Sequence, residues 1–165
     1  MKCVADTSAI SWLGRADYLW LLKEIYEGVY SPQVVFDQLK SHKQAKEFVE
    51  NELEKIVLSE EGEKKFKLLS DKWQTWTGTK DRGDIEVFVT HHFFLYVDEM
   101  LFANKDAERK FKKYGKVRDI SSLYELAEAR GVFTKDDSQK FLESFLELNP
   151  PYRPDVIKKH LEGLI

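Results

Sequence analysis

The chain has 165 residues, of which 42% are hydrophobic and 33% charged, and its formal net charge is −3. This length suits one domain with a substantial core, and no apolar run approaches the length of a membrane span. The mild negative charge argues against a passive nucleic-acid coat. A single cysteine excludes an internal disulfide, and the first apolar run follows no basic leader, so we expect a cytoplasmic protein without membrane contact.

The first apolar run, Cys3–Ala5, ends at an acid and two hydroxyls, Asp6, Thr7 and Ser8. A run this short is typical of a buried strand in a parallel sheet. Strands of this kind deliver their last residues to the carboxyl edge of the sheet, where open α/β folds place their sites. Asp6 is therefore the first candidate functional residue.

Further short apolar runs alternate with helical patterns along the chain. The other predicted strands are Val29–Tyr30, Ile56–Leu58, Phe93–Val97 and Val117–Ile120. Phe93–Val97 is the clearest continuous run, and it ends at Asp98. The alternation predicts a three-layer α/β domain with a mostly parallel sheet. Right-handed crossovers would then bring the carboxyl ends of the strands to one edge.

Helical periodicity follows each predicted strand. Asp17 and Thr134 are predicted helix caps, and Pro32 lies in the first turn of the helix after the second strand. Residues 134–165 are predicted to form a helical extension whose apolar faces either pack back onto the domain or form a dimer surface. The predicted helices cover residues 9–13, 17–27, 32–39, 42–53, 60–76, 84–89, 103–114, 123–130, 134–148 and 156–164.

Three acids stand where a parallel sheet assembles a site. Asp6 and Asp98 follow predicted strands, and Asp84 begins a helix directly after a glycine-containing loop. Hard divalent cations such as Mg²⁺ and Mn²⁺ prefer carboxylate oxygens and keep several waters, and they can activate water for displacement at phosphorus. The chain lacks a phosphate loop, zinc-type Cys and His spacing and a serine nucleophile elbow. Alternatively, Asp6 and Asp84 serve only as helix caps.

The order of several segments resembles a known family. Val4–Ile10 resembles the opening signature of PIN domains, which are metal-dependent ribonucleases, and the resemblance extends to about residue 133. The segment that ends at Gly131 resembles one found in a prokaryotic, often archaeal, PIN subfamily. The segments that resemble later PIN elements, in order, are Val29–Val35, Gly83–Glu86, Leu95–Glu99 and Ile120–Gly131.

The resemblance implies a PIN-like three-layer α/β/α sandwich over residues 1–133 with a five-stranded parallel sheet. It implies an endonuclease, a hydrolase of single-stranded RNA that uses Mg²⁺ or Mn²⁺ held by Asp6, Asp84 and Asp98 as metal-binding and catalytic residues. The biological role implied is a VapC-type toxin, with an antitoxin partner and a homodimer, or an RNA-processing enzyme. The polar residues expected around the ligands are Thr7, Ser8, Gln38 and Ser122.

One position departs from the family pattern. PIN domains usually carry Glu where this chain has Gln38, and a neutral amide is a weaker ligand for a hard cation. Asp37, Glu86 or Glu99 could compensate as a further metal ligand. The alternative is a degenerate, non-catalytic PIN-fold module that binds RNA or a protein partner. A phosphatase is a third hypothesis, although the first strand lacks the Asp-x-Asp spacing.

Two basic stretches are candidates for phosphate contact. Both could equally be solvated helix faces. Trp73 and Trp76, three residues apart, favour a core or subunit contact over base stacking. The first stretch comprises Lys105, Arg109, Lys110, Lys112, Lys113, Lys116 and Arg118. Of these, the residues predicted to bind RNA are Lys105, Arg109, Lys110 and Lys113. The second stretch comprises Lys40, His42, Lys43 and Lys46.

Overall fold

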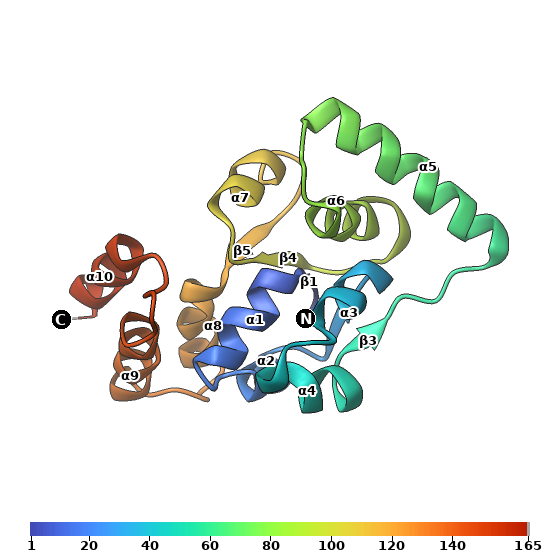
Figure 1. Ribbon diagram of the computed structural model, residues 1–165. Coiled ribbons are helices and arrows are strands. Elements are labelled where there is room, and N and C mark those ends of the chain that lie inside the picture. Colours follow the sequence, from blue (N-terminus) through green and yellow to red (C-terminus); the bar gives the residue numbers. More distant parts are fainter. Residues whose placement is uncertain (165) are drawn as a thin grey trace.

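The computed structural model describes residues 1–164, and its centre is a five-stranded, all-parallel sheet with the order β3-β2-β1-β4-β5 (Figure 1). The predicted three-layer α/β/α sandwich is confirmed, since helices lie on both faces of this sheet (Figure 1). The strands are β1 (Lys2–Ala5), β2 (Gly28–Ser31), β3 (Glu54–Lys55), β4 (Glu99–Phe102) and β5 (Val117–Asp119).

The helices divide between the two faces of the sheet (Figure 1). One face carries α5 (Glu60–Thr77), α6 (Arg82–Val89) and α7 (Lys105–Phe111). Short turns η1 (Lys43–Ala45) and η3 (Ile120–Ser122) precede α4 and α8. The opposite face carries α1 (Thr7–Arg15), α2 (Trp20–Ile25), α3 (Gln33–Leu39), α4 (Lys46–Asn51) and α8 (Leu123–Ala129).

The core lies between the central strands and these helices. Val4 of β1 and Leu101 of β4 have no exposed surface, because helices cover both faces of the sheet. Phe88 of α6 stacks on Phe111 of α7 with ring centroids 4.8 Å apart. Phe111 also stacks on Phe102 of β4. Burying one such side chain contributes roughly 1.5–3 kcal/mol, so these rings hold α6 and α7 against the sheet.

The strand predicted at Phe93–Val97 is wrong. Residues Thr90–Phe94 instead form η2, a widened helical turn that continues α6, and β4 begins only at Glu99. A continuous apolar run does not by itself distinguish a strand from a helix. The sequence did not indicate β4 because the strand begins with a charged residue, Glu99. Glu99 is fully buried, and it pairs with Arg118, which is far away in the sequence.

Two further sequence predictions are wrong in detail. The predicted strand Ile56–Leu58 lies beyond β3, which pairs with β2 only at Glu54 and Lys55. Asp17 does not cap α2; its backbone is left-handed, with φ 63°, and Leu19 occupies the cap position without a side-chain bond. Asp tolerates this conformation better than most residues, which explains its place in the turn.

The C-terminal segment forms α9 (Lys135–Leu146) and α10 (Pro154–Gly163). Thr134 begins α9 with a reciprocal capping box to Asp137, as the sequence predicts. Phe141 is fully buried, and α9 contacts α8 while α10 contacts η3. The described part of this extension therefore packs back onto the domain.

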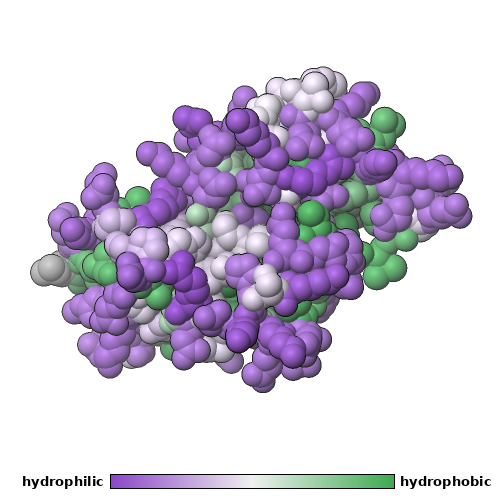
Figure 2. Space-filling view, in the orientation of Figure 1, coloured by the Kyte–Doolittle hydropathy of each residue, from purple (hydrophilic) through white to green (hydrophobic). Residues whose placement is uncertain are grey.

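Most of the surface seen in Figure 2 is polar, and apolar atoms gather beside α5 and the segment that leads into it. Trp76 of α5 and Val57 of that segment are among the exposed large hydrophobic side chains. Across residues 1–164, no helix has both the length and the apolar character needed to cross a membrane.

Candidate functional site

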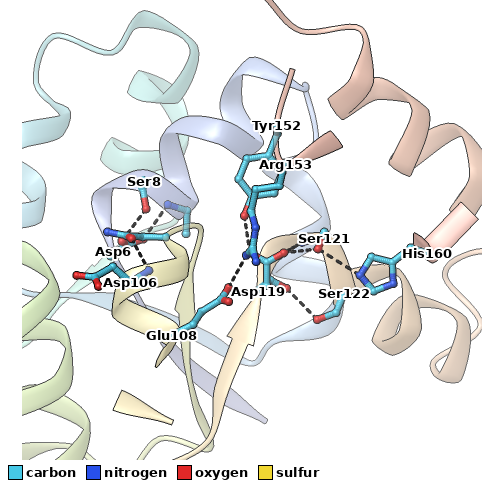
Figure 3. Close-up of polar contacts among 12 residues, drawn as sticks. Asp6, Ser8, Asp106, Glu108, Asp119, Ser121, Ser122, Tyr152, Arg153 and His160 are labelled. Carbon is cyan, nitrogen blue, oxygen red and sulfur yellow. Dashed lines mark hydrogen bonds and ion pairs between the residues drawn. The ribbon is translucent and has the colours of Figure 1, made fainter. Parts of the chain in front are cut away.

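Asp6 lies at the carboxyl edge of the sheet, directly after β1, and begins α1 as its N-cap. Its Oδ1 accepts the backbone N–H of Ala9 at 2.7 Å, and its Oδ2 accepts the hydroxyl of Ser8 at 2.7 Å (Figure 3). The residue is only 2% exposed. Capping therefore holds this carboxyl in one orientation at the edge.

Asp84 reaches the same place from the first turn of α6. Asp81 caps that helix by accepting the backbone N–H of Asp84 at 3.3 Å. Asn104, which begins α7, donates its side-chain amide to Asp84 Oδ2 at 3.2 Å. Asp84 is 4% exposed, and its carboxyl lies close enough to that of Asp6 for each to act on the pKa of the other. The N-terminal ends of α1 and α6 thus bring two buried carboxyls together, and Asn104, after β4, holds one of them.

No basic side chain neutralises this pair. None of the ion pairs among residues 1–164 includes Asp6 or Asp84. Burial raises the pKa of Asp6 to about 6. Burial, then the charges of Asp6 and Asp81, raises the pKa of Asp84 to about 9. The pair therefore retains a proton that two separate, solvated aspartates would lose at neutral pH.

Thr7 and Gln38 form a polar contact beside the pair. The Thr7 hydroxyl donates to the Gln38 side-chain oxygen. That oxygen lies 3.0 Å from the position a Cβ would take at Gly83, so the glycine allows α3 to approach the first turn of α6 closely. Gln38 thus lies at the rim of the site as a neutral amide.

The structure does not bring Asp98 to the other two acids. Because β4 begins after Asp98, this residue lies at the amino edge of the sheet, where its Oδ2 accepts the backbone N–H of Lys2 at 2.6 Å. Lys2 and Asp6 are separated by the length of β1, about 13 Å at 3.3 Å per residue. The prediction that Asp98 shares a site with Asp6 and Asp84 is therefore wrong.

The possible substitute ligands also lie away from the pair. Asp37 is exposed and pairs with Lys40. Glu86 pairs with Arg82 at 3.8 Å. Ser122, expected near the ligands, instead accepts a hydrogen bond from Arg118.

Glu99 is fully buried, and its carboxylate is held by basic residues of β5 and the turn before it. Arg118 Nε lies 2.8 Å from Glu99 Oε1, and Lys116 Nζ lies 3.6 Å from Oε2. The predictions that Asp37, Glu86 or Glu99 completes the site are not supported by their positions.

The basic stretch on α7 is partly neutralised. Arg109 and Lys110 both pair with Asp106, at 2.7 and 3.1 Å, and Lys113 lies over the ring of Tyr114. Lys105 is exposed at the start of the helix. Because their charges are shared with Asp106, Arg109 and Lys110 are weaker candidates for phosphate contact than the sequence suggests.

Sequence reasoning missed Asn104, the residue that holds Asp84. Asn is a preferred helix cap, and Asn104 caps α7 by accepting the backbone N–H of Asp106. The segment after Phe102 would have been searched for site residues if the start of β4 had been predicted correctly. Whether Asn104 could be predicted as a site residue therefore depended on one strand boundary.

Within residues 1–164, no three His, Cys, Asp or Glu side chains gather closely enough to hold a metal ion by themselves. No family model, curated protein or solved structure matches the chain. Any functional assignment must therefore start from the Asp6–Asp84 pair and its surroundings.

Proposed function

We propose that the chain is a metal-dependent endoribonuclease of PIN type, with Mg²⁺ or Mn²⁺ held by Asp6 and Asp84. The observation that carries this proposal is the contact between two buried carboxyls without a basic partner in the described chain. Like charges this close are unfavourable unless a proton or a cation lies with them. A divalent ion would replace the retained proton and relieve the repulsion.

The residues present fit such an ion. Mg²⁺ commonly takes one or two protein carboxylates and completes its octahedron with waters and substrate phosphate. Asp6 and Asp84 supply the carboxylates, while Ser8 and Asn104 donate hydrogen bonds that orient them. Gln38 adds no charge, which leaves coordination positions to water and to the phosphate of the substrate.

The division of labour follows from this arrangement. When bound, the ion would supply a polarised water and charge stabilisation at phosphorus. Asp6 is fixed by two hydrogen bonds and keeps one orientation. Asp84 is held by Asn104, so its two oxygens are not equivalent. These contacts preorganise the carboxyls toward the place where the phosphate would lie.

The test is cleavage of a labelled, unstructured RNA in Mn²⁺ by the wild type and by Asp6→Asn. We expect the variant to lose cleavage by at least about 100-fold, because it removes a charged ligand while keeping the shape and the helix cap. Asp98→Asn is the matched control, since that acid lies at the opposite edge. A fully active, folded Asp6→Asn protein would contradict the assignment.

A non-catalytic PIN-fold module that binds RNA or a protein partner is the second candidate. The observation that favours it is that, among residues 1–164, no third acid joins Asp6 and Asp84 to form a metal site and Gln38 lies beside them. The two candidates differ in their response to Mn²⁺, because a ligand of the folded state raises the melting temperature. A wild type that is neither stabilised by Mn²⁺ nor active on RNA would favour the second candidate.

The cellular role proposed with the nuclease is that of a homodimeric VapC-type toxin with an antitoxin partner, or of an RNA-processing enzyme. A small neighbouring reading frame for a DNA-binding protein would support the toxin role. Co-expression of that protein with this chain should then suppress RNA cleavage and yield a stable complex.

A further inference from the structure

A groove of about 380 Å³ opens beside the acid pair along α1. Ser8 belongs to both places, since it lines the groove and donates its hydroxyl to Asp6. The groove therefore begins at the candidate metal site and leads away from it. The side chains used below line it: Ser8, Ser11, Trp12, Arg15, His42 and Asp81.

The groove follows one face of α1. Lining residues of α1 are spaced by three or four positions, so they lie one above another on the helix. They are Ser8, then Ser11 and Trp12, then Arg15. Seven residues separate Ser8 from Arg15, a distance of about 10 Å at 1.5 Å per residue. This length matches about three stacked nucleotides at 3.4 Å each.

Arg15 supplies a cation at the far end of the groove. Its guanidinium lies over the Trp12 ring, 4.3 Å from the centroid. In the described chain its one hydrogen bond is to the carbonyl oxygen of Asn149 at 3.2 Å, and no carboxylate pairs with it. A planar guanidinium with free donors suits phosphate, and its face can support a base.

His42 supplies a second polar group opposite α1. Its Nδ1 lies 3.2 Å from the hydroxyl of Ser11, which holds the imidazole in place. Its other nitrogen has no partner among residues 1–164 and the ring is part-exposed. The groove thus offers a hydroxyl, an imidazole and a guanidinium on facing elements.

The charge in the groove is graded along its length. Asp81 is the one acid among the lining residues, and it caps α6 next to Asp84. The acidic end therefore coincides with the candidate metal site, and the basic end is at Arg15. A phosphodiester chain with one phosphate on a metal ion and another at Arg15 would match both ends.

We infer that this groove binds the single-stranded RNA that adjoins the scissile phosphate. Arg15 and His42 contact a neighbouring phosphate, and the Arg15–Trp12 stack supports the base attached to it. This inference rests on the proposed nuclease function for the direction of the strand. The competing explanation is structural: Arg15 anchors the Asn149 carbonyl, while Trp12 packs on Tyr152 at 5.0 Å.

The test measures binding of a fluorescent, unstructured 12-nucleotide RNA by fluorescence anisotropy. Binding is measured once in EDTA and once in Ca²⁺, because Ca²⁺ binds to oxygen ligands such as carboxylates. We expect Arg15→Gln to weaken binding by at least about fivefold and to lower the slope of log K against log salt by about 0.7, the share of one phosphate. His42→Gln should weaken binding as well. Arg130→Gln removes the same charge from an exposed arginine just after α8 and should change little.

The outcomes separate the two proposals. Equal binding by Arg15→Gln and Arg130→Gln, or no RNA binding by the wild type in either buffer, overturns the groove whatever the cleavage assay shows. Weaker binding by Arg15→Gln, with no cleavage by the wild type in Mn²⁺, keeps the groove and rejects the nuclease.

A variant that preserves charge guards against a folding artefact. Arg15→Lys keeps the cation but loses the stacked plane, so it should retain the salt slope and recover only part of the affinity. Melting temperatures of all variants are compared first. A folded Arg15→Lys protein that binds RNA no better than Arg15→Gln would reject the phosphate contact.

Discussion

Acids meet in two places along the carboxyl edge, and they differ in what neutralises them. Figure 3 shows Arg153 beside Asp119 and Glu108, which form one of the two. Asp119, at the end of β5, accepts Arg153 Nη1 at 2.9 Å and the hydroxyl of Tyr152, and the same nitrogen of Arg153 lies 3.0 Å from Glu108. Asp6, after β1, and Asp84, in the first turn of α6, have no such cation among residues 1–164. The Asp119 cluster carries its own counter-charge, although burial and Asp119 still raise the pKa of Glu108 to about 8. The Asp6–Asp84 pair has only a proton to offset its charge.

The presence or absence of a cation suggests a different role for each cluster. Arg153 comes from the start of α10, so its pairing ties the C-terminal helices to the sheet edge. In this cluster the guanidinium of Arg153 already supplies a positive charge beside both acids. An acid pair without one is a cost to folding that a bound cation would offset, and such costs are typical of functional sites.

Removing the counter-charge of the first cluster should give the largest loss of stability. Arg153→Met leaves Asp119 and Glu108 with no cation, and truncating one partner of a buried pair costs about 3–5 kcal/mol. Partial exposure of these side chains lowers the expected loss to about 2–3 kcal/mol. Urea unfolding measures it, and a loss below that of the exposed control Arg109→Met would contradict the comparison.

Mn²⁺ should stabilise the wild type by about 2.7 kcal/mol at a hundred times its dissociation constant. For a chain of this size that amounts to a rise of several degrees in melting temperature. Asp84→Asn should abolish the rise because it removes a charged ligand, whereas Asp98→Asn should preserve it. An equal rise in all three proteins would place the metal elsewhere.

Without metal, replacing Asp84 by Asn should stabilise the protein, because the folded wild type must keep a proton on the pair that the unfolded chain releases. In EDTA at pH 8, Asp84→Asn is expected to be more stable than the wild type by about 1–2 kcal/mol. The amide keeps the shape of the side chain but carries no charge. Urea unfolding beside Asp98→Asn measures the change, and a destabilised Asp84→Asn protein would mean that the carboxyl pair is favourable as it stands.

The same pair sets a pH dependence in EDTA. Because burial raises the pKa of both acids, to about 6 for Asp6 and about 9 for Asp84, the folded state holds protons that the unfolded chain releases near its ordinary pKa. This stabilisation is complete below about pH 4 and is lost as pH rises toward 9. Asp84→Asn should flatten the curve above pH 6, and an unchanged slope would contradict the assignment.

The smallest effect is expected at the opposite edge. Asp98→Asn weakens one hydrogen bond to the Lys2 backbone, so it should cost no more than about 1 kcal/mol and leave RNA cleavage unchanged. The melting temperature and the cleavage rate measure these two effects. A loss of cleavage in this variant would restore the original three-acid site.

Local patterns account for what could be predicted. The buried run before Asp6, the capping box at Thr134 and the turn before Asp84 depend on residues a few positions apart, so periodicity and capping rules were sufficient to find them. The same rules failed at β4. Its first residue, Glu99, is tolerated in a strand only because Arg118 and Tyr26 reach it.

By itself, the sequence determined the layered α/β fold, the order of its elements and the position of Asp6 after the first strand. The tertiary structure alone decided which acids meet. Asp84 rather than Asp98 joins Asp6, Asn104 orients Asp84, and Arg153 neutralises acids more than thirty residues away. The reason is physical: a carboxylate's partners are set by strand register and helix approach, which depend on contacts between residues far apart in the chain.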